Sequence, residues 1–125
     1  MTQKIIVLIA SALGGLTVAI GAFGAHALAP LLQASGRTDT FETAVKYQMY
    51  HTLALVAVGL LLFRVEQPAL QVAAWCFFLG ILIFSGSLYT LVLTGITWLG
   101  AITPIGGTLF IVGWAALFYA VLKAL

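Results

Sequence analysis

The feature that most constrains this chain is the distribution of its charged side chains. No charged residue occurs from Ile5 to Gly36 or from Gln67 to Leu122. Only 6% of the residues are charged and 63% are hydrophobic, whereas a water-soluble domain carries about 25% charged residues. A fold in water cannot cover its surface with so few polar groups, so the sequence predicts an integral membrane protein.

The lengths of the apolar runs predict helices. A helix needs about 20 apolar residues to cross a bilayer, and a chain of 125 residues accommodates one domain with four such helices. Transmembrane strands would alternate apolar and polar side chains, and no such alternation is seen. The predicted fold class is all-α, a transmembrane four-helix bundle of up-down-up-down topology that covers residues 1–125. The predicted spans are about 5–28, 40–63, 69–93 and 104–122.

The positions of Lys and Arg predict the orientation in the membrane. Both ends of a four-span chain lie on one side, which here holds Lys4, Arg64 and Lys123, against Arg37 and Lys46 on the other. Basic loops stay preferentially in the cytoplasm. We therefore expect both termini in the cytoplasm. The net charge of +2 is dispersed, so we expect no nucleic-acid partner.

Polar side chains gather in the half of the predicted bundle that is remote from the termini. The other half is nearly apolar and includes Trp114. Polar groups at membrane depth are costly unless they pair, so we expect a shared polar layer that links His26 and His51 directly or through neighbouring side chains or water. The candidate residues are His26, Tyr47, Gln48, His51, Ser85, Ser87, Tyr89 and Thr103.

Two interpretations of this layer stay open. Hydrogen bonds between helices commonly just hold them in register, which is the interpretation we favour. Alternatively, the His26/His51 layer binds a metal ion, haem, quinone or lipid headgroup. A metal site needs three or four ligands as a rule, and two histidines without a nearby carboxylate or thiolate fall short. We therefore expect no metal and no cofactor.

Small residues at helical spacing predict close contacts between helices, because packing replaces the hydrophobic effect as the driving force in lipid. An alternative for the fourth span is an anion that approaches exposed amides at the helix start. The expected packing positions are Ser11, Gly15, Gly21 and Ala25 in the first span and Gly106 and Gly107 in the fourth.

Four short motifs, in this order along the chain, resemble one bacterial membrane family. They are Gly21-Ala22-Phe23-Gly24-Ala25-His26, Tyr47-Gln48-x-x-His51, Phe84-Ser85-Gly86-Ser87-Leu88-Tyr89 and Thr103-Pro104-x-Gly106-Gly107. The family is domain of unknown function 423, with the small eukaryotic transmembrane protein 256 as a relative. The resemblance implies a small four-span inner-membrane protein and brings no activity, substrate or cofactor. The residues that it identifies as recurrent are His26, Gln48, His51, Ser85, Gly86, Tyr89 and Pro104.

Three kinds of function stay open: a structural or accessory membrane protein, which we favour, a ligand-binding membrane protein, and a small oligomeric transporter. Catalysis is disfavoured because no carboxylate pair, activated nucleophile or phosphate loop is visible, and the lone thiol of Cys76 is expected far from both histidines. Proton-coupled export of cations is disfavoured because the first span lacks an acidic residue. The expected partner is the lipid bilayer, and further copies of the chain or a larger membrane complex are candidates.

Overall fold

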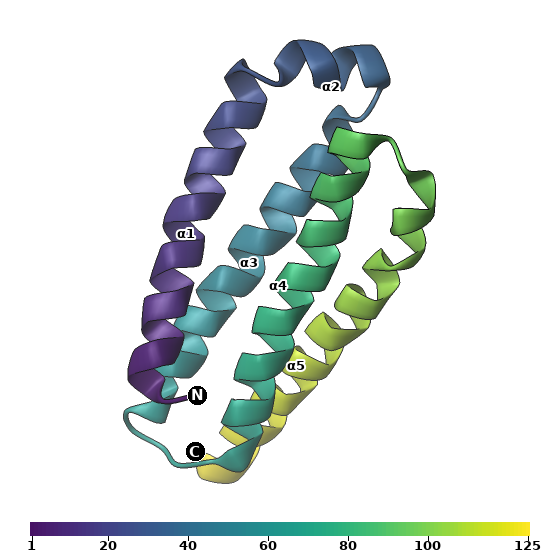
Figure 1. Cartoon of the computed structure of the whole chain (residues 1–125). Coiled ribbons are helices and arrows are strands. Elements are labelled where there is room, and N and C mark those ends of the chain that lie inside the picture. Colours follow the sequence, from purple (N-terminus) through teal and green to yellow (C-terminus); the bar gives the residue numbers. More distant parts are fainter.

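The computed structural model covers residues 1–125 and consists of helices joined by short connections, without any strand. Its four long helices are α1 (Gln3–His26), α3 (Thr38–Leu62), α4 (Pro68–Thr94) and α5 (Thr103–Ala124), which lie side by side in chain order (Figure 1). The predicted all-α class is confirmed, and each long helix begins and ends close to the predicted positions.

Two short helices were not predicted. Helix α2 (Ala29–Ser35) crosses the end of the molecule between α1 and α3, and a 3₁₀ helix, η1 (Thr97–Ala101), precedes α5 (Figure 1). Pro30 lies in the first turn of α2, and Gly36 ends this helix with a left-handed φ of 70°. Proline at a helix start and glycine just after its end are the usual local signals, so α2 has boundaries that the sequence itself encodes.

Three segments are long and apolar enough to cross a membrane: α1, α4 and the stretch Thr97–Ala124, which contains α5. Helix α3 is as long as the others but is less apolar, because it includes polar side chains such as Lys46, Gln48 and His51 between its start and its middle. Length and apolarity alone therefore support three spans rather than the four that we predicted.

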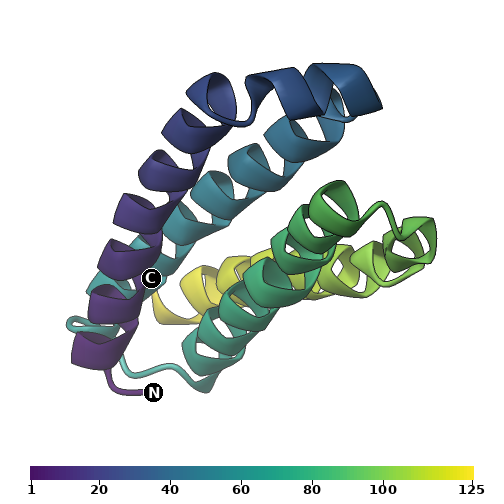
Figure 2. The same cartoon turned by 45° about the horizontal axis from the view of Figure 1, so that its top comes forward.

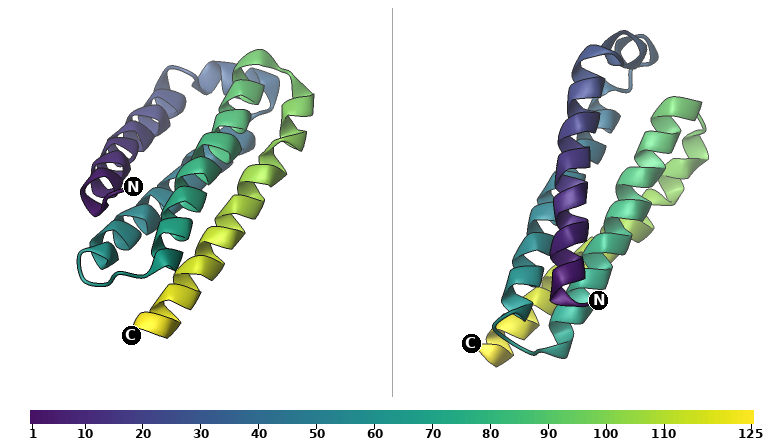
Figure 3. Two further views of the ribbon diagram at one scale, coloured as in Figure 1. Left: turned by 60° about the horizontal axis from the view of Figure 1, so that its bottom comes forward. Right: turned by 60° about the vertical axis from the view of Figure 1, so that its left-hand side comes forward.

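The long helices form a row in which each packs against the next in the chain, α1 on α3, α3 on α4 and α4 on α5. The pair α1 and α3 is inclined to the pair α4 and α5 (Figure 2). Both termini lie at the same end of the molecule, opposite α2 (Figure 3).

Glycines let the helices approach closely, because a glycine has no side chain and an aromatic ring or apolar side chain of the neighbouring helix occupies the space instead. A Cβ atom on Gly106 would lie 2.5 Å from the backbone nitrogen of Phe84, so α5 touches the backbone of α4 at this point. Three further glycines pack against an aromatic ring of the neighbouring helix, one between α1 and α3 and two between α4 and α5. The pairs are Gly24 with Phe41, Gly80 with Phe110 and Gly113 with Phe77.

The face of α1 that packs on α3 is rotated from the expected one. Ser11 and Gly15 are exposed, and no atom outside the helix lies within 4 Å of a Cβ built on Gly15. Gly21 does face α3, at 3.4 Å from Val45, while Ala25 is exposed. The residues of α1 that are buried are Ile6, Ala10, Thr17 and Gly24.

The two glycines at the start of α5 differ in their surroundings. Gly106 is buried against Phe84, whereas a Cβ on Gly107 would meet only ring atoms of Phe84 at the ordinary distance of 3.8 Å. Gly107 is therefore not a position of close packing.

Candidate functional site

The polar side chains of α3, α4 and α5 form several separate hydrogen-bonded groups rather than one continuous layer. Each group joins two helices, and the members come from nearly every position that the sequence singled out. The geometry of each group decides whether a donor or acceptor is left over for a ligand.

His51 lies near the middle of α3 and is only 5% exposed. Its Nδ1 is 2.7 Å from the carbonyl oxygen of Tyr47, and its Nε2 is 3.0 Å from Nε1 of Trp114 on α5. A carbonyl only accepts and an indole N–H only donates, so His51 is the neutral tautomer with its proton on Nδ1. Both ring nitrogens are thus occupied within the chain.

Aromatic rings hold the imidazole of His51 in place. The ring of Phe110 on α5 stacks on it with the centroids 3.5 Å apart and an interplanar angle of 7°. Phe77 of α4 and Trp114 approach from other directions at centroid distances of 5.7 Å and 5.9 Å. The imidazole therefore links three helices at once.

Two hydrogen bonds join α3 to α4. Ser85 donates to the carbonyl oxygen of Ala44 at 2.7 Å, and the Tyr89 hydroxyl donates to Oε1 of Gln48 at 2.7 Å. Gln48 and Ser85 are almost completely buried. In an apolar interior such groups are stable only when they are paired, and this pairing fixes how far α3 can slide along α4.

A third group joins α4 to the start of α5. The hydroxyl groups of Ser87 and Thr103 are 2.6 Å apart, and Ser87 also bonds to the carbonyl oxygen of Phe84. The hydroxyl of Thr103 also donates to the carbonyl oxygen of Leu99, one turn earlier in the chain.

His26 and Tyr47 do not take the places that the sequence suggested. His26 is exposed at the last residue of α1, and both ring nitrogens of His51 are bonded to other groups. Tyr47 contributes its backbone carbonyl to His51, while its own ring stacks on Phe84 with the centroids 4.8 Å apart. A layer shared by the two histidines is therefore not formed.

Three hydrogen bonds between residues that are far apart in the chain were not predicted from the sequence. Trp114 was assigned to the apolar half, yet it is the side-chain partner of His51. Arg37 donates from Nη1 to the carbonyl oxygen of Leu91 near the end of α4. The N-terminal amine of Met1 donates to Oε1 of Gln71 at 2.9 Å. No short sequence motif connects these positions, because each pair is separated by more than fifty residues.

The donors that a metal ion or haem iron requires do not converge. No group of three or more His, Cys, Asp and Glu side chains lies together. An iron or zinc atom could bind His51 at Nε2 only by displacing the indole of Trp114. The arrangement can hold helices in register, and it offers no nucleophile paired with a base.

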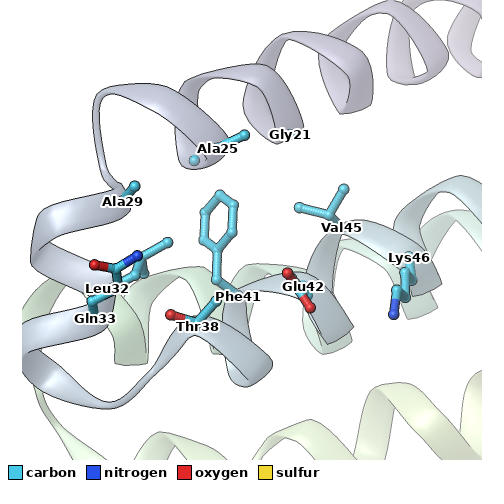
Figure 4. Close-up of a pocket in the computed structure, with 11 residues that line it drawn as sticks. Gly21, Ala25, Ala29, Leu32, Gln33, Thr38, Phe41, Glu42, Val45 and Lys46 are labelled. Atoms are coloured by element: carbon cyan, nitrogen blue, oxygen red, sulfur yellow. The ribbon is translucent and has the colours of Figure 1, made fainter.

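Two open grooves flank these groups. One, of about 550 Å³, lies between α3 and α5, with Tyr50, His51 and Trp114 among its lining residues. The other, of about 560 Å³, lies between the end of α1, helix α2 and the start of α3, and we call it the α1–α2–α3 groove (Figure 4). Its lining combines apolar side chains, such as Phe41 and Val45, with the charged side chains of Glu42 and Lys46.

Comparison with known proteins gives one family. Residues 20–107 match the family described as Protein of unknown function (DUF423). A UPF0382 membrane protein of Staphylococcus epidermidis is 44% identical over 121 residues, which are 97% of this chain and 98% of the relative. A UPF0382 membrane protein of Haemophilus influenzae is 42% identical over 125 residues, covering 99% and 98% of the two chains. The UPF0382 membrane protein YwdK of Bacillus subtilis is 39% identical over 124 residues, covering 98% and 100%. No solved structure matches.

Proposed function

The chain belongs to the DUF423 family of membrane proteins, and from that premise we propose that it is a four-span inner-membrane protein with a structural or accessory role. In this proposal the polar groups inside the protein join its helices and do not bind a cofactor. The lipid bilayer is its principal partner.

Helix α3 is the proposed fourth span. Its 25 residues extend over about 37 Å at 1.5 Å per residue, which exceeds the roughly 30 Å of hydrocarbon in a bilayer. Two of the polar side chains that lower its hydropathy are turned inward, whereas Lys46 is exposed near the start of the helix. Gln48 and His51 are buried and bond to Tyr89 and Trp114 of the neighbouring helices. A span that hides its polar groups between other spans does not expose them to lipid.

The proposed orientation has both termini in the cytoplasm. Four spans bring the two ends of the chain to one side, in agreement with their position in Figure 3. That side carries Lys4, Arg64 and Lys123, and basic residues favour the cytoplasm. Alkaline phosphatase fused to the C-terminus should therefore be inactive, and green fluorescent protein fused there should fluoresce. Active phosphatase at the C-terminus would reverse the assignment.

One observation supports the structural role above all others, namely the full occupancy of His51. This ionisable residue, central in its helix, is the strongest candidate for a ligand, since such groups within a membrane usually serve a function. Here Nδ1 bonds to Tyr47 and Nε2 to Trp114, while Phe110 covers one ring face. The same imidazole that could have bound a ligand connects α3, α4 and α5 instead.

Absorption spectroscopy and metal analysis of the detergent-purified protein test the proposal. We expect no absorbance beyond that of the aromatic side chains and far less than one metal ion per chain. His51→Leu should lower stability without changing either measurement. A visible absorption band, or stoichiometric metal that is lost in His51→Leu, would contradict the structural role.

A further inference from the structure

The α1–α2–α3 groove has the features of a site for one phospholipid headgroup. The groove lies at the end of the molecule opposite the termini, where α2 crosses from α1 to α3 (Figure 1). Figure 4 shows the ring of Phe41 pointing toward Ala25 of α1, with Glu42 and Lys46 following along α3. The groove is partly open to the surroundings.

The charges of the groove are free to bind a ligand. Glu42 and Lys46 are one helical turn apart in the order that favours an ion pair, yet neither takes part in an ion pair or a hydrogen bond within the chain. Both side chains are exposed and line the same groove. The carboxylate and the ammonium can therefore both contact one ligand of mixed charge.

The order of these charges along α3 selects the ligand. Helix α3 begins at Thr38, which places Glu42 about 6 Å and Lys46 about 12 Å below the start of the helix at 1.5 Å per residue. The headgroup region of one leaflet is about 5–8 Å thick. With the start of α3 at its outer surface, Glu42 lies among headgroups and the backbone of Lys46 lies about 4–7 Å below them, from where its long side chain reaches back to the phosphates. An outer negative charge and an inner positive charge fit a headgroup with an outer ammonium and an inner phosphate.

We propose that this groove binds a phospholipid whose headgroup carries a primary ammonium group and a phosphate, as in phosphatidylethanolamine. Glu42 accepts hydrogen bonds from the lipid ammonium, and Lys46 donates to the phosphate. One acyl chain then follows the apolar lining of the groove, where Val45 is partly exposed and Leu32 and Phe41 are almost buried behind it. The inference rests on the proposed membrane placement, because the charges meet headgroups only when α3 crosses the bilayer.

Native mass spectrometry of the full chain, released from micelles that contain equal amounts of phosphatidylethanolamine and phosphatidylglycerol, tests this site. We expect one phosphatidylethanolamine molecule to remain bound, with about a tenfold preference, the factor expected for one charge-assisted hydrogen bond. Glu42→Gln should abolish the preference, and Lys46→Gln should lower retention of both lipids. Ala25→Phe, at an exposed lining position, should fill the groove and displace the lipid.

Matched variants separate the groove from general effects. Glu66→Gln removes an exposed carboxylate at the other end of the molecule, and Ala22→Phe adds a ring to an exposed position of α1 outside the groove. Both should retain phosphatidylethanolamine as the wild type does. Circular dichroism establishes that each variant is folded.

Three results would overturn the site. The first is that the wild type retains phosphatidylglycerol as well as phosphatidylethanolamine, and the second is that Ala25→Phe retains as much phosphatidylethanolamine as the wild type. The third is a lipid-free dimer that Ala25→Phe dissociates, which would show that a second copy of the chain occupies the groove. Failure of the membrane placement is recognised separately, because it also changes the reporter fusions, whereas failure of the groove alone leaves the reporter fusions unchanged.

Discussion

The interface between α1 and α3 and the block formed by α3, α4 and α5 are held together by different interactions. Within the block, side-chain hydrogen bonds join every pair of helices: Ser85 and Tyr89 connect α3 to α4, Ser87 connects α4 to α5, and Trp114 connects α5 to α3. No side-chain hydrogen bond joins α1 to α3. Next to the start of α1, Met1 forms two hydrogen bonds with Gln71 of α4, and these are the polar contacts that attach the N-terminal end of the chain to the block.

This difference has a physical consequence in a membrane. Lipid tails are as apolar as leucine side chains, so burial of apolar surface between two helices gives little driving force, and close packing and hydrogen bonds decide the association. Helix α1 is held to α3 by packing alone, through buried side chains such as Ile6 and Ala10 and at the glycine notches of Gly24 in α1 and Gly59 in α3. We infer that α1 is the most weakly held long helix.

The largest effect is expected inside the block, for Gly106→Ala. The new Cβ would lie 2.5 Å from the backbone nitrogen of Phe84, and this atom moves only if α4 moves. We expect the free energy of unfolding to fall by about 3 kcal/mol, the upper end of the usual cost of overpacking. Titration with sodium dodecyl sulfate, followed by circular dichroism, measures the change.

Gly107→Ala is the matched control for this variant. Its nearest neighbours are ring atoms of Phe84 at 3.8 Å, and alanine favours a helix over glycine by up to about 1 kcal/mol. Gly107→Ala should therefore unfold at the same detergent concentration as the wild type or at a higher one. If the two alanine variants were equally stable, the close contact between Gly106 and the backbone of Phe84 would not contribute to the stability of the block.

A smaller effect is expected for the hydrogen bond between α3 and α5. Trp114→Phe leaves Nε2 of His51 buried without a donor, which should lower the free energy of unfolding by about 2 kcal/mol. The double variant with His51→Leu should lose less than the sum of the two single variants, because the pair is broken only once. Trp75→Phe, at an exposed tryptophan, is the control and should be neutral. Strict additivity would show that the two residues do not interact.

The α1–α3 interface should respond more weakly. A leucine at Gly21 meets Val45, whose Cγ1 lies 3.4 Å from the position of a Cβ atom. Since this neighbour is a side chain that can shift, we expect Gly21→Leu to lower the free energy of unfolding by only about 1 kcal/mol. A leucine at position 15 would point into open space, so Gly15→Leu should leave the free energy of unfolding of the monomer unchanged. A larger loss for Gly15→Leu would show that the exposed face of α1 is covered by another chain.

Much of the fold could be predicted because it follows from local features of the sequence. The long uncharged stretches locate α1, α4 and α5, and local signals mark most of their ends: Thr2 caps α1, proline starts α4 and α5, and Gly95 ends α4. Helix α2 was overlooked because its seven residues were too polar and too few to appear as a span, although Pro30 and Gly36 mark both of its ends. The number of spans, the orientation and the relation to transmembrane protein 256 stay predictions.

The site could be predicted only in part, because its contacts depend on how each helix is rotated. Gln48, Ser85 and Tyr89 were recognised as polar residues at membrane depth, and the structure places them together. The partner of His51 was missed because Trp114 lies 63 positions away and a tryptophan in a span is usually an anchor at the membrane surface. The notch at Gly113, next to Trp114, sets the rotation of α5, and no spacing in the sequence reveals it.

The smallest effect, and the one of opposite sign, concerns Thr52. This residue of α3 is buried against α1, where its Cγ2 lies 3.7 Å from the position of a Cβ on Gly14, and its hydroxyl has no hydrogen-bond partner. A buried unpaired hydroxyl costs about 1–3 kcal/mol, part of which an apolar group of the same shape recovers. Thr52→Val should therefore raise the free energy of unfolding by about 0.5–1 kcal/mol. The matched control is Ser85→Ala, which removes a paired hydroxyl of the block and should lower stability by a similar amount. If Thr52→Val were destabilising, the hydroxyl would have to bond to a water molecule, to a carbonyl of α3 itself or to α1. Only a bond to α1 would remove the difference in hydrogen bonding between the α1–α3 interface and the block.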